Sequence, residues 1–241
     1  VGGNVELIPE DTLPKGSNAI AIHPTRTDSG EAFLAINSHQ PLEGPVAWYE
    51  AHLNSEEGWN ALGGLFPGGA MIFHGANEHL GWAHTVNSPD FLDLYQLELN
   101  PEDEDEYRVD GEWLEFETRI VWLKVRLWDW ITLPVPKKVW KSIYGPTLVT
   151  EQGAFSIRFG ALDRVGAPEQ WWKMNKAKNF SEWKAAMSSM QLTNFNTVYA
   201  DKYDTIFYVS NGLLPKRTPG FDYSGTVPGN TKKTLWTEYH S

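Results

Sequence analysis

The sequence GSNAIAI occupies residues 16–22 and marks a change of pattern along the chain. Its two isoleucines alternate with small alanines, which is the period-two pattern of a half-buried strand. The turn-forming sequence TDSG follows at residues 27–30, and AFLAI at residues 32–36 is typical of a second, more buried strand. We therefore expect a β-hairpin whose first strand begins at Ser17.

On either side of this hairpin the chain changes in character. Residues 1–16 mix glycine, proline and charge without periodicity, as linkers do. Further strands are expected at residues 46–53, 69–74, 80–86, 91–98, 196–201 and 205–210. The pair Asp110-Gly111 predicts a type I′ hairpin turn, and Asn179 or Ser181 can cap a helix in the sequence NFSEWKAAMSSM. Many strands with a few helices predict an α+β fold.

The composition limits the classes of function. The chain has 241 residues, of which 41% are hydrophobic and 21% charged, as in ordinary globular proteins. With a formal net charge of −11, we expect neither nucleic acid nor a membrane as a partner. The absence of cysteine excludes a disulfide scaffold, a cysteine nucleophile and thiolate metal ligands.

A glycine followed by a serine is by itself an ordinary turn pair, so Ser17 gains meaning only from its context. Further blocks follow as NSH (37–39), WAHTVN (82–87), SIYGP (142–146), FNTVYAD (195–201), PG (228–229) and LWTE (235–238). In order and spacing, these blocks resemble the start of the catalytic chain in the penicillin acylase family, which includes penicillin, cephalosporin and acyl-homoserine-lactone acylases. The resemblance covers nearly all of the chain from Ser17 onward.

The resemblance implies a fold and a setting. Family members are made as long precursors with an α chain, a spacer and a β chain, and they fold as an αββα sandwich of the N-terminal-nucleophile hydrolase type. Residues 1–16 then match the end of the spacer, and residues 17–241 match the first, incomplete part of the β chain. The implied partners are the remainder of the precursor and an acyl amide substrate. The implied location is periplasmic or secreted.

The chemistry of such a family explains the serine. A hydroxyl is a weak nucleophile unless a base is close, and an α-amine with a pKa of about 7.7–8.0 is such a base. That amine exists on Ser17 only after the Gly16–Ser17 bond is cut. The resemblance implies autoproteolysis, in which Ser17 Oγ attacks the Gly16 carbonyl. Gly16 suits this step because no Cβ obstructs the approach to its carbonyl.

Two further residues receive catalytic roles from the resemblance. The backbone N–H of Val86 is expected to donate to the oxyanion, and His39 to tune proton transfer near Ser17. The second oxyanion donor, an asparagine, matches a position beyond Ser241, so we expect the 241-residue chain to be inactive by itself. His84 receives no family role and is expected to be a packed or hydrogen-bonded strand histidine.

Binding residues follow in the same way. The resemblance places a structural Ca²⁺ at Asp90, Leu92 and Asp93, although two solvated loop acids are the alternative. No organic cofactor is expected. Candidate contacts to the acyl group are Gln40, Phe73, Trp171 and Trp172, with core packing as the alternative for each.

The expected function is an amidohydrolase that cleaves a linear amide of a small molecule or a lipopeptide-like substrate. The acyl group of the substrate is aromatic, dicarboxylic or fatty, and the sequence does not choose among these three classes. A non-catalytic, sheet-rich module that binds ligands through exposed aromatic side chains is the alternative, and it predicts that Ser17 is dispensable. A carboxylate-based hydrolase lacks a spaced Asp/Glu pair with a supporting context.

Overall fold

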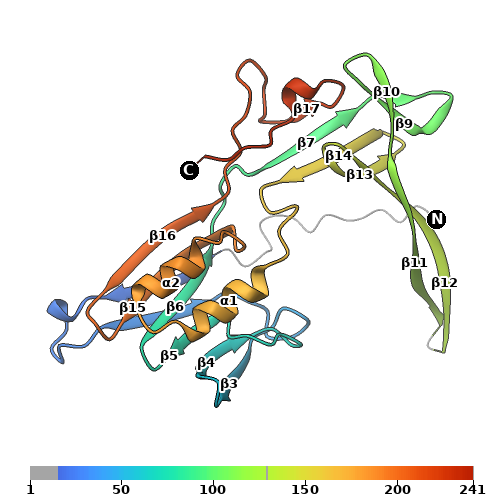
Figure 1. Cartoon of the computed structure of the whole chain (residues 1–241). Helices are drawn as coiled ribbons and strands as arrows, with labels where there is room; N and C mark the ends of the chain where they lie inside the picture. The colour runs from blue at the N-terminus through green and yellow to red at the C-terminus, as the bar shows by residue number, and fades with distance from the viewer. Residues whose placement is uncertain (1–15, 129, 241) are drawn as a thin grey trace. The chain divides into compact units, whose positions relative to one another are not determined.

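The computed structural model describes residues 16–128 and 130–240, which form two compact units (Figure 1). Of the described residues, unit 1 contains 16–89 and Asp163–Gly212, and unit 2 contains 90–128, 130–162 and 213–240. Of the expected linker, residues 1–15 lie outside the described residues.

Unit 1 is built on a six-stranded antiparallel sheet with the strand order β16-β15-β6-β5-β4-β3. The strands are β3 (Tyr49–Ser55), β4 (Trp59–Leu65), β5 (His74–Asn77), β6 (Leu80–Val86), β15 (Asn194–Asp201) and β16 (Ile206–Gly212). The helices α1 (Ala167–Lys176) and α2 (Phe180–Met187) pack on one face of this sheet, as Figure 1 shows. Trp82 of β6 and Trp183 of α2 are fully buried in the core between them.

The other face of the sheet carries the expected hairpin, formed by β1 (Ser17–Ile22) and β2 (Phe33–Ser38) with the 3₁₀ turn η2 (Pro24–Arg26) between them. A Cβ placed on Gly81 would lie 2.8 Å from Leu34 Cδ2 in β2, whereas the neighbouring Trp82 belongs to the core on the helix side. Because consecutive strand residues point to opposite faces, β6 lies between the hairpin and the helices. The complete αββα sandwich stays a prediction.

The regular elements among the described residues of unit 2 are strands and one 3₁₀ turn. Its larger sheet has the order β11-β12-β13-β14-β7-β17, and its smaller sheet the order β10-β9-β8. The elements are β7 (Leu92–Leu97), β8 (Leu99–Asn100), β9 (Asp103–Val109), β10 (Glu112–Glu115), β11 (Glu117–Trp128), β12 (Ile131–Ser142), β13 (Gly145–Thr150), β14 (Gly153–Phe159), β17 (Thr226–Pro228) and the 3₁₀ turn η3 (Lys232–Thr234). Tyr95, Tyr107 and Tyr144 form much of its core. None of the helices in the described part of the chain is long and apolar enough to cross a membrane.

Most of the expected elements are present, and the α+β class is confirmed. The Asp110-Gly111 turn has positive φ values of 51° and 92°, as a type I′ turn requires. Asn179 caps α2, with its Oδ1 accepting from the Glu182 N–H at 3.0 Å. The strand expected at residues 69–74 is wrong, because only His74 belongs to a strand. The backbone of Ile72 in this apolar run bonds instead to a side chain of α1.

Candidate active site

Ser17 is the first residue of β1 and lies opposite Ser38 of β2. Its Oγ accepts a hydrogen bond of 3.4 Å from the backbone N–H of His39. The preceding Gly16 has a φ of +86°, and a Cβ added there would meet no neighbour within 4 Å. The left-handed conformation, and not crowding, is therefore what calls for glycine before the serine. Because Oγ acts as an acceptor towards His39, the hydroxyl proton remains available for transfer to a base.

His39 directly follows β2, and the structure brings it next to Ser17 through its backbone. The Nε2 of its ring lies 3.3 Å from Asn18 Nδ2 and 3.2 Å from Asn37 Nδ2. Both amide groups are donors, which assigns an unprotonated Nε2 and a proton on Nδ1. The expected pairing of His39 with Ser17 is present in space, while its role in proton transfer stays a prediction.

Val86 is the last residue of β6 and is 60% exposed. The hairpin strand β1 lies against both β6 and its neighbour β15, so Ser17 and Val86 belong to adjoining layers. Asn196 of β15 donates through Nδ2 to Thr85 Oγ1 at 3.2 Å and to the Val86 carbonyl at 3.5 Å. This amide holds the end of β6, and its position in the block FNTVYAD is the sequence signal that could have identified it.

His84 is buried in the same strand, two residues before Val86. Its Nε2 accepts from Trp171 Nε1 at 3.2 Å, so the ring proton is on Nδ1, which lies 2.9 Å from Thr197 Oγ1. Burial, with a smaller contribution from His74, lowers the pKa of His84 well below 6.5. His84 is thus a neutral, hydrogen-bonded strand histidine, as expected from the sequence.

His74 supports this arrangement from β5. Its Nδ1 accepts from the backbone N–H of His84 at 3.0 Å, and burial lowers its pKa from the ordinary 6.5 to about 4. A protonated Nδ1 could not accept this bond, so the neutral form is the one that fits the fold.

Two of the four candidate acyl contacts lie together. Phe73 stacks on Trp171 with 4.2 Å between the ring centroids. Trp172, the next residue of α1, is instead 39% exposed and lies under the Lys176 ammonium at 4.7 Å. Gln40 lies just after β2, where its backbone N–H donates to the Ser38 carbonyl. Of the two neighbouring tryptophans, Trp171 therefore packs against Phe73, whereas Trp172 is exposed to solvent.

The pair Phe73 and Trp171 depends on a residue that sequence analysis missed. Asn175 of α1 accepts from the Ile72 N–H at 3.0 Å and donates to the carbonyls of Ile72 and Trp171, each at 2.8 Å. It thereby fixes the backbone beside Phe73 and the helix turn that carries Trp171. An asparagine inside a helix gave no local signal of this role.

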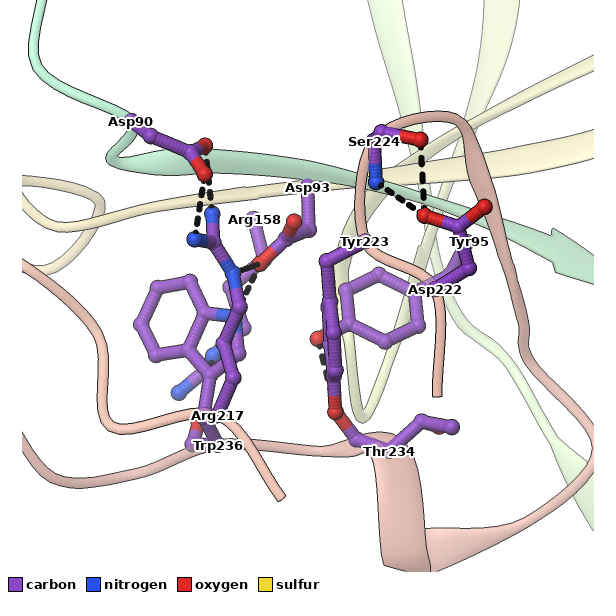
Figure 2. A network of polar contacts seen from close by, with 10 residues as sticks. All are labelled: Asp90, Asp93, Tyr95, Arg158, Arg217, Asp222, Tyr223, Ser224, Thr234 and Trp236. Atoms are coloured by element: carbon purple, nitrogen blue, oxygen red, sulfur yellow. Dashed lines mark hydrogen bonds and ion pairs between the residues drawn. The ribbon is translucent and has the colours of Figure 1, made fainter. Parts of the chain in front are cut away.

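In unit 2, the candidate calcium ligands lie at the start of β7. Asp90 precedes the strand, Leu92 is its first residue, and Asp93 is 1% exposed. Both carboxylates bind the guanidinium of Arg217 (Figure 2). Within residues 16–128 and 130–240, no group of three or more His, Cys, Asp or Glu side chains is arranged to hold a metal ion.

Known proteins are similar to the chain over most of its length. A family model described as penicillin amidase matches residues 3–241. Acyl-homoserine lactone acylase PvdQ of Pseudomonas fluorescens (strain Pf0-1) is 32% identical over 211 residues, which are 84% of this chain and 27% of that protein. Penicillin G acylase of Escherichia coli is 28% identical over 248 residues, which are 96% of this chain and 28% of that protein. The chain thus spans about a quarter of the length of these relatives.

Two further proteins extend the comparison. Aculeacin-A acylase of Actinoplanes utahensis is 26% identical over 211 residues, which are 84% of this chain and 26% of that protein. The solved structure of a thermostable penicillin G acylase from Alcaligenes faecalis matches with a TM-score of 0.78 and 26% sequence identity. This match covers 92% of the chain and 40% of that structure.

Proposed function

The chain belongs to the penicillin amidase family, and we propose that it carries the N-terminal nucleophile of an acylase, with Ser17 in that role. The observation that carries the proposal is the position of Ser17, which opens β1 directly after a left-handed glycine and within the matched region. The compared relatives are named as acylases, which supports hydrolysis of a linear amide to a carboxylic acid and an amine.

Activation begins with the cut before Ser17. Its Oγ bonds to the Gly16 carbonyl carbon while the Gly16–Ser17 C–N bond breaks, and the serine nitrogen takes up the hydroxyl proton. Water then hydrolyses the resulting ester, which leaves a carboxylic acid on Gly16 and a free amine and hydroxyl on Ser17. The hydrogen bond from the His39 N–H to Oγ supports this reaction because it orients the oxygen without using its proton.

Turnover repeats the same chemistry on a substrate. The amine of Ser17 accepts the hydroxyl proton while Oγ attacks the amide carbonyl, and the developing oxyanion accepts from the backbone N–H of Val86. The amine product leaves with the transferred proton, and water hydrolyses the acyl-enzyme to the acid. The bond from Asn196 to the Val86 carbonyl supports a fixed strand end at this donor.

The acyl group is proposed to be aromatic or fatty. The stack of Phe73 on Trp171 presents apolar surface, and Trp171 is tied through His84 to the strand that ends at Val86. Apolar pockets with a few fixed polar groups are typical of small-molecule sites. A dicarboxylic acyl group would need a cationic partner for its second carboxylate.

Activity of the full-length protein on phenylacetyl, glutaryl and long-chain acyl amides tests the proposal. We expect hydrolysis of a phenylacetyl or long-chain amide, and none after Ser17→Ala. Trp171→Leu should raise KM for the preferred amide or change the preference, whereas Trp172→Leu, the exposed neighbour, should leave both unchanged. Hydrolysis that survives Ser17→Ala would reject the nucleophile, and equal effects of the two tryptophan changes would reject the acyl contact.

A sheet-rich binding module is the second candidate. The observation in its favour is the β11–β12 ribbon, on which Trp122 and Trp128 are 65% and 62% exposed. Exposed aromatic side chains of this kind can hold a lipid, a glycan or a peptide. This candidate predicts normal function after Ser17→Ala, so the same variant separates the two proposals.

A further inference from the structure

A buried carboxylate in unit 2 needs a positive partner. The side chain of Asp93 has no exposed surface, and leaving such a charge unpaired is costly. The resemblance to penicillin acylases implies that Ca²⁺ fills this need. The structure places a different cation there, since Arg217 Nε donates to Asp93 Oδ2 at 2.9 Å.

Arg217 also binds the second carboxylate. Its Nη1 and Nη2 donate to the two oxygens of Asp90 at 2.6 and 2.7 Å, which is the bidentate geometry that a guanidinium favours. Figure 2 shows the guanidinium between the two carboxylates. A guanidinium stays protonated in proteins, so Arg217 is a permanent positive charge.

The surrounding side chains hold Arg217 in this position. Its side chain is 18% exposed, and the ring centroid of Tyr223 lies 5.3 Å from its Cζ. Trp236 donates through Nε1 to the same Asp93 oxygen at 2.6 Å. Arg158 in turn lies over the Trp236 ring at 4.7 Å and donates through Nε to the Trp236 carbonyl at 2.9 Å. Contacts from several segments thus fix the cation and its carboxylates together.

The oxygens that remain do not suit calcium. Three of the four carboxylate oxygens of Asp90 and Asp93 accept from Arg217 or Trp236, and Asp93 Oδ1 is the one without a partner in the described structure. Ca²⁺ takes about six to eight oxygen ligands at roughly 2.3–2.6 Å. A divalent ion at that distance would meet the guanidinium and be repelled by its charge.

We propose that Arg217 is a built-in cation that replaces Ca²⁺ between Asp90 and Asp93, so that this part of the protein does not depend on calcium. The guanidinium joins the start of β7 to the segment that directly follows the residues paired with 238–240. This proposal is independent of Ser17 and of the acylase reaction.

Melting of the full-length protein in Ca²⁺ and in a chelator tests the proposal. Wild type and Asp90→Asn should respond to calcium equally, because Asp90 binds no calcium when Arg217 is present. The side chain of Asp90 is 71% exposed, so Asp90→Asn is expected to fold. A calcium-dependent rise in the melting temperature of wild type that Asp90→Asn abolishes would overturn the proposal.

Removal of the Arg217 guanidinium should make the melting temperature depend on calcium. Arg217→Gln should melt lower in chelator and recover by about 5 °C in saturating Ca²⁺, and Asp90→Asn in the same chain should cancel this recovery. Tb³⁺ binding provides a second readout. Trp236 lies beside Asp93 and can sensitise the luminescence of a Tb³⁺ ion bound there. Arg217→Gln should gain a signal that Ca²⁺ displaces, while Arg108→Gln, which removes an exposed ion pair with Glu98, should not. An Asp90-dependent Tb³⁺ signal already present in wild type would contradict the proposal.

Discussion

Asn175→Ala removes the side chain that joins α1 to the apolar segment before β5. The amide makes two bonds to the backbone of Ile72, which has no exposed surface, and one to the Trp171 carbonyl, and its oxygen also accepts from Trp59 Nε1 at 3.3 Å. The Trp171 carbonyl still accepts from the helix in the variant, because it is four residues before Asn175. The N–H and the carbonyl of Ile72 lose their partners.

The free-energy cost of the substitution is estimated from the N–H and the carbonyl of Ile72. A buried backbone group left without a partner costs about 1–3 kcal/mol, so the pair costs about 2–6 kcal/mol. Every 1.4 kcal/mol is a tenfold change in an equilibrium constant. Even the lower bound therefore predicts an increase of about thirtyfold in the hydrogen-exchange rate of the Ile72 amide.

Hydrogen exchange of the full-length protein, read by mass spectrometry in the peptide that contains Ile72, measures this rate. Lys173→Ala is the matched control on the same helix, since it removes only an exposed ion pair with Glu169, which the solvent screens. It should change the rate by less than about threefold. A rate in Asn175→Ala no faster than in Lys173→Ala would refute the role given to Asn175.

Two further predictions concern stability. Asn179→Ala should lower the free energy of unfolding of α2 by about 1 kcal/mol, because it removes the oxygen that accepts from the Glu182 N–H. Asn179→Ser keeps a capping oxygen and should be close to neutral. Equal hydrogen-exchange rates in α2 for wild type and both variants would contradict the cap. The pKa of His74 is about 4 in the folded state, below the unfolded value of 6.5. Between these two values the unfolded state binds more protons, so the free energy of unfolding should fall as the pH drops from about 6.5 towards 4. His74→Asn keeps an acceptor for the His84 N–H and should reduce this loss in melting temperature between pH 7 and pH 5, and an unchanged loss would reject the assignment.

The sequence predicted the elements whose signals are local. The alternation after Ser17 predicted the hairpin, and Asn179 predicted the start of α2. Helix α1 was not predicted, because its N-cap is Gly166, which makes no side-chain capping bond. The ribbon β11–β12 was also not predicted, since most of its residues are exposed and show no buried alternation.

Contacts between residues far apart in the chain limit how much of the candidate site can be predicted from the sequence. The position of Ser17 beside His39 follows from one hairpin, and the resemblance had made both residues candidates. Arg217 lies 124 residues from Asp93 in the chain, and no local pattern connects them. The same holds for Asn175 and Ile72, which are 103 residues apart. Such pairs emerge only when the sheet and the segments around it are assembled.

The mass and the N-terminal sequence of the polypeptides that the full-length protein yields on expression test directly whether Ser17 is the N-terminal nucleophile. We expect a chain that begins at Ser17 in wild type, and one uncut precursor after Ser17→Ala. Ser38→Ala, which removes the hydroxyl opposite Ser17 in the hairpin, should still be cut. A wild-type protein that stays joined at Gly16–Ser17, or a Ser17→Ala variant that is cut there, would show that Ser17 is not an autocatalytically released nucleophile.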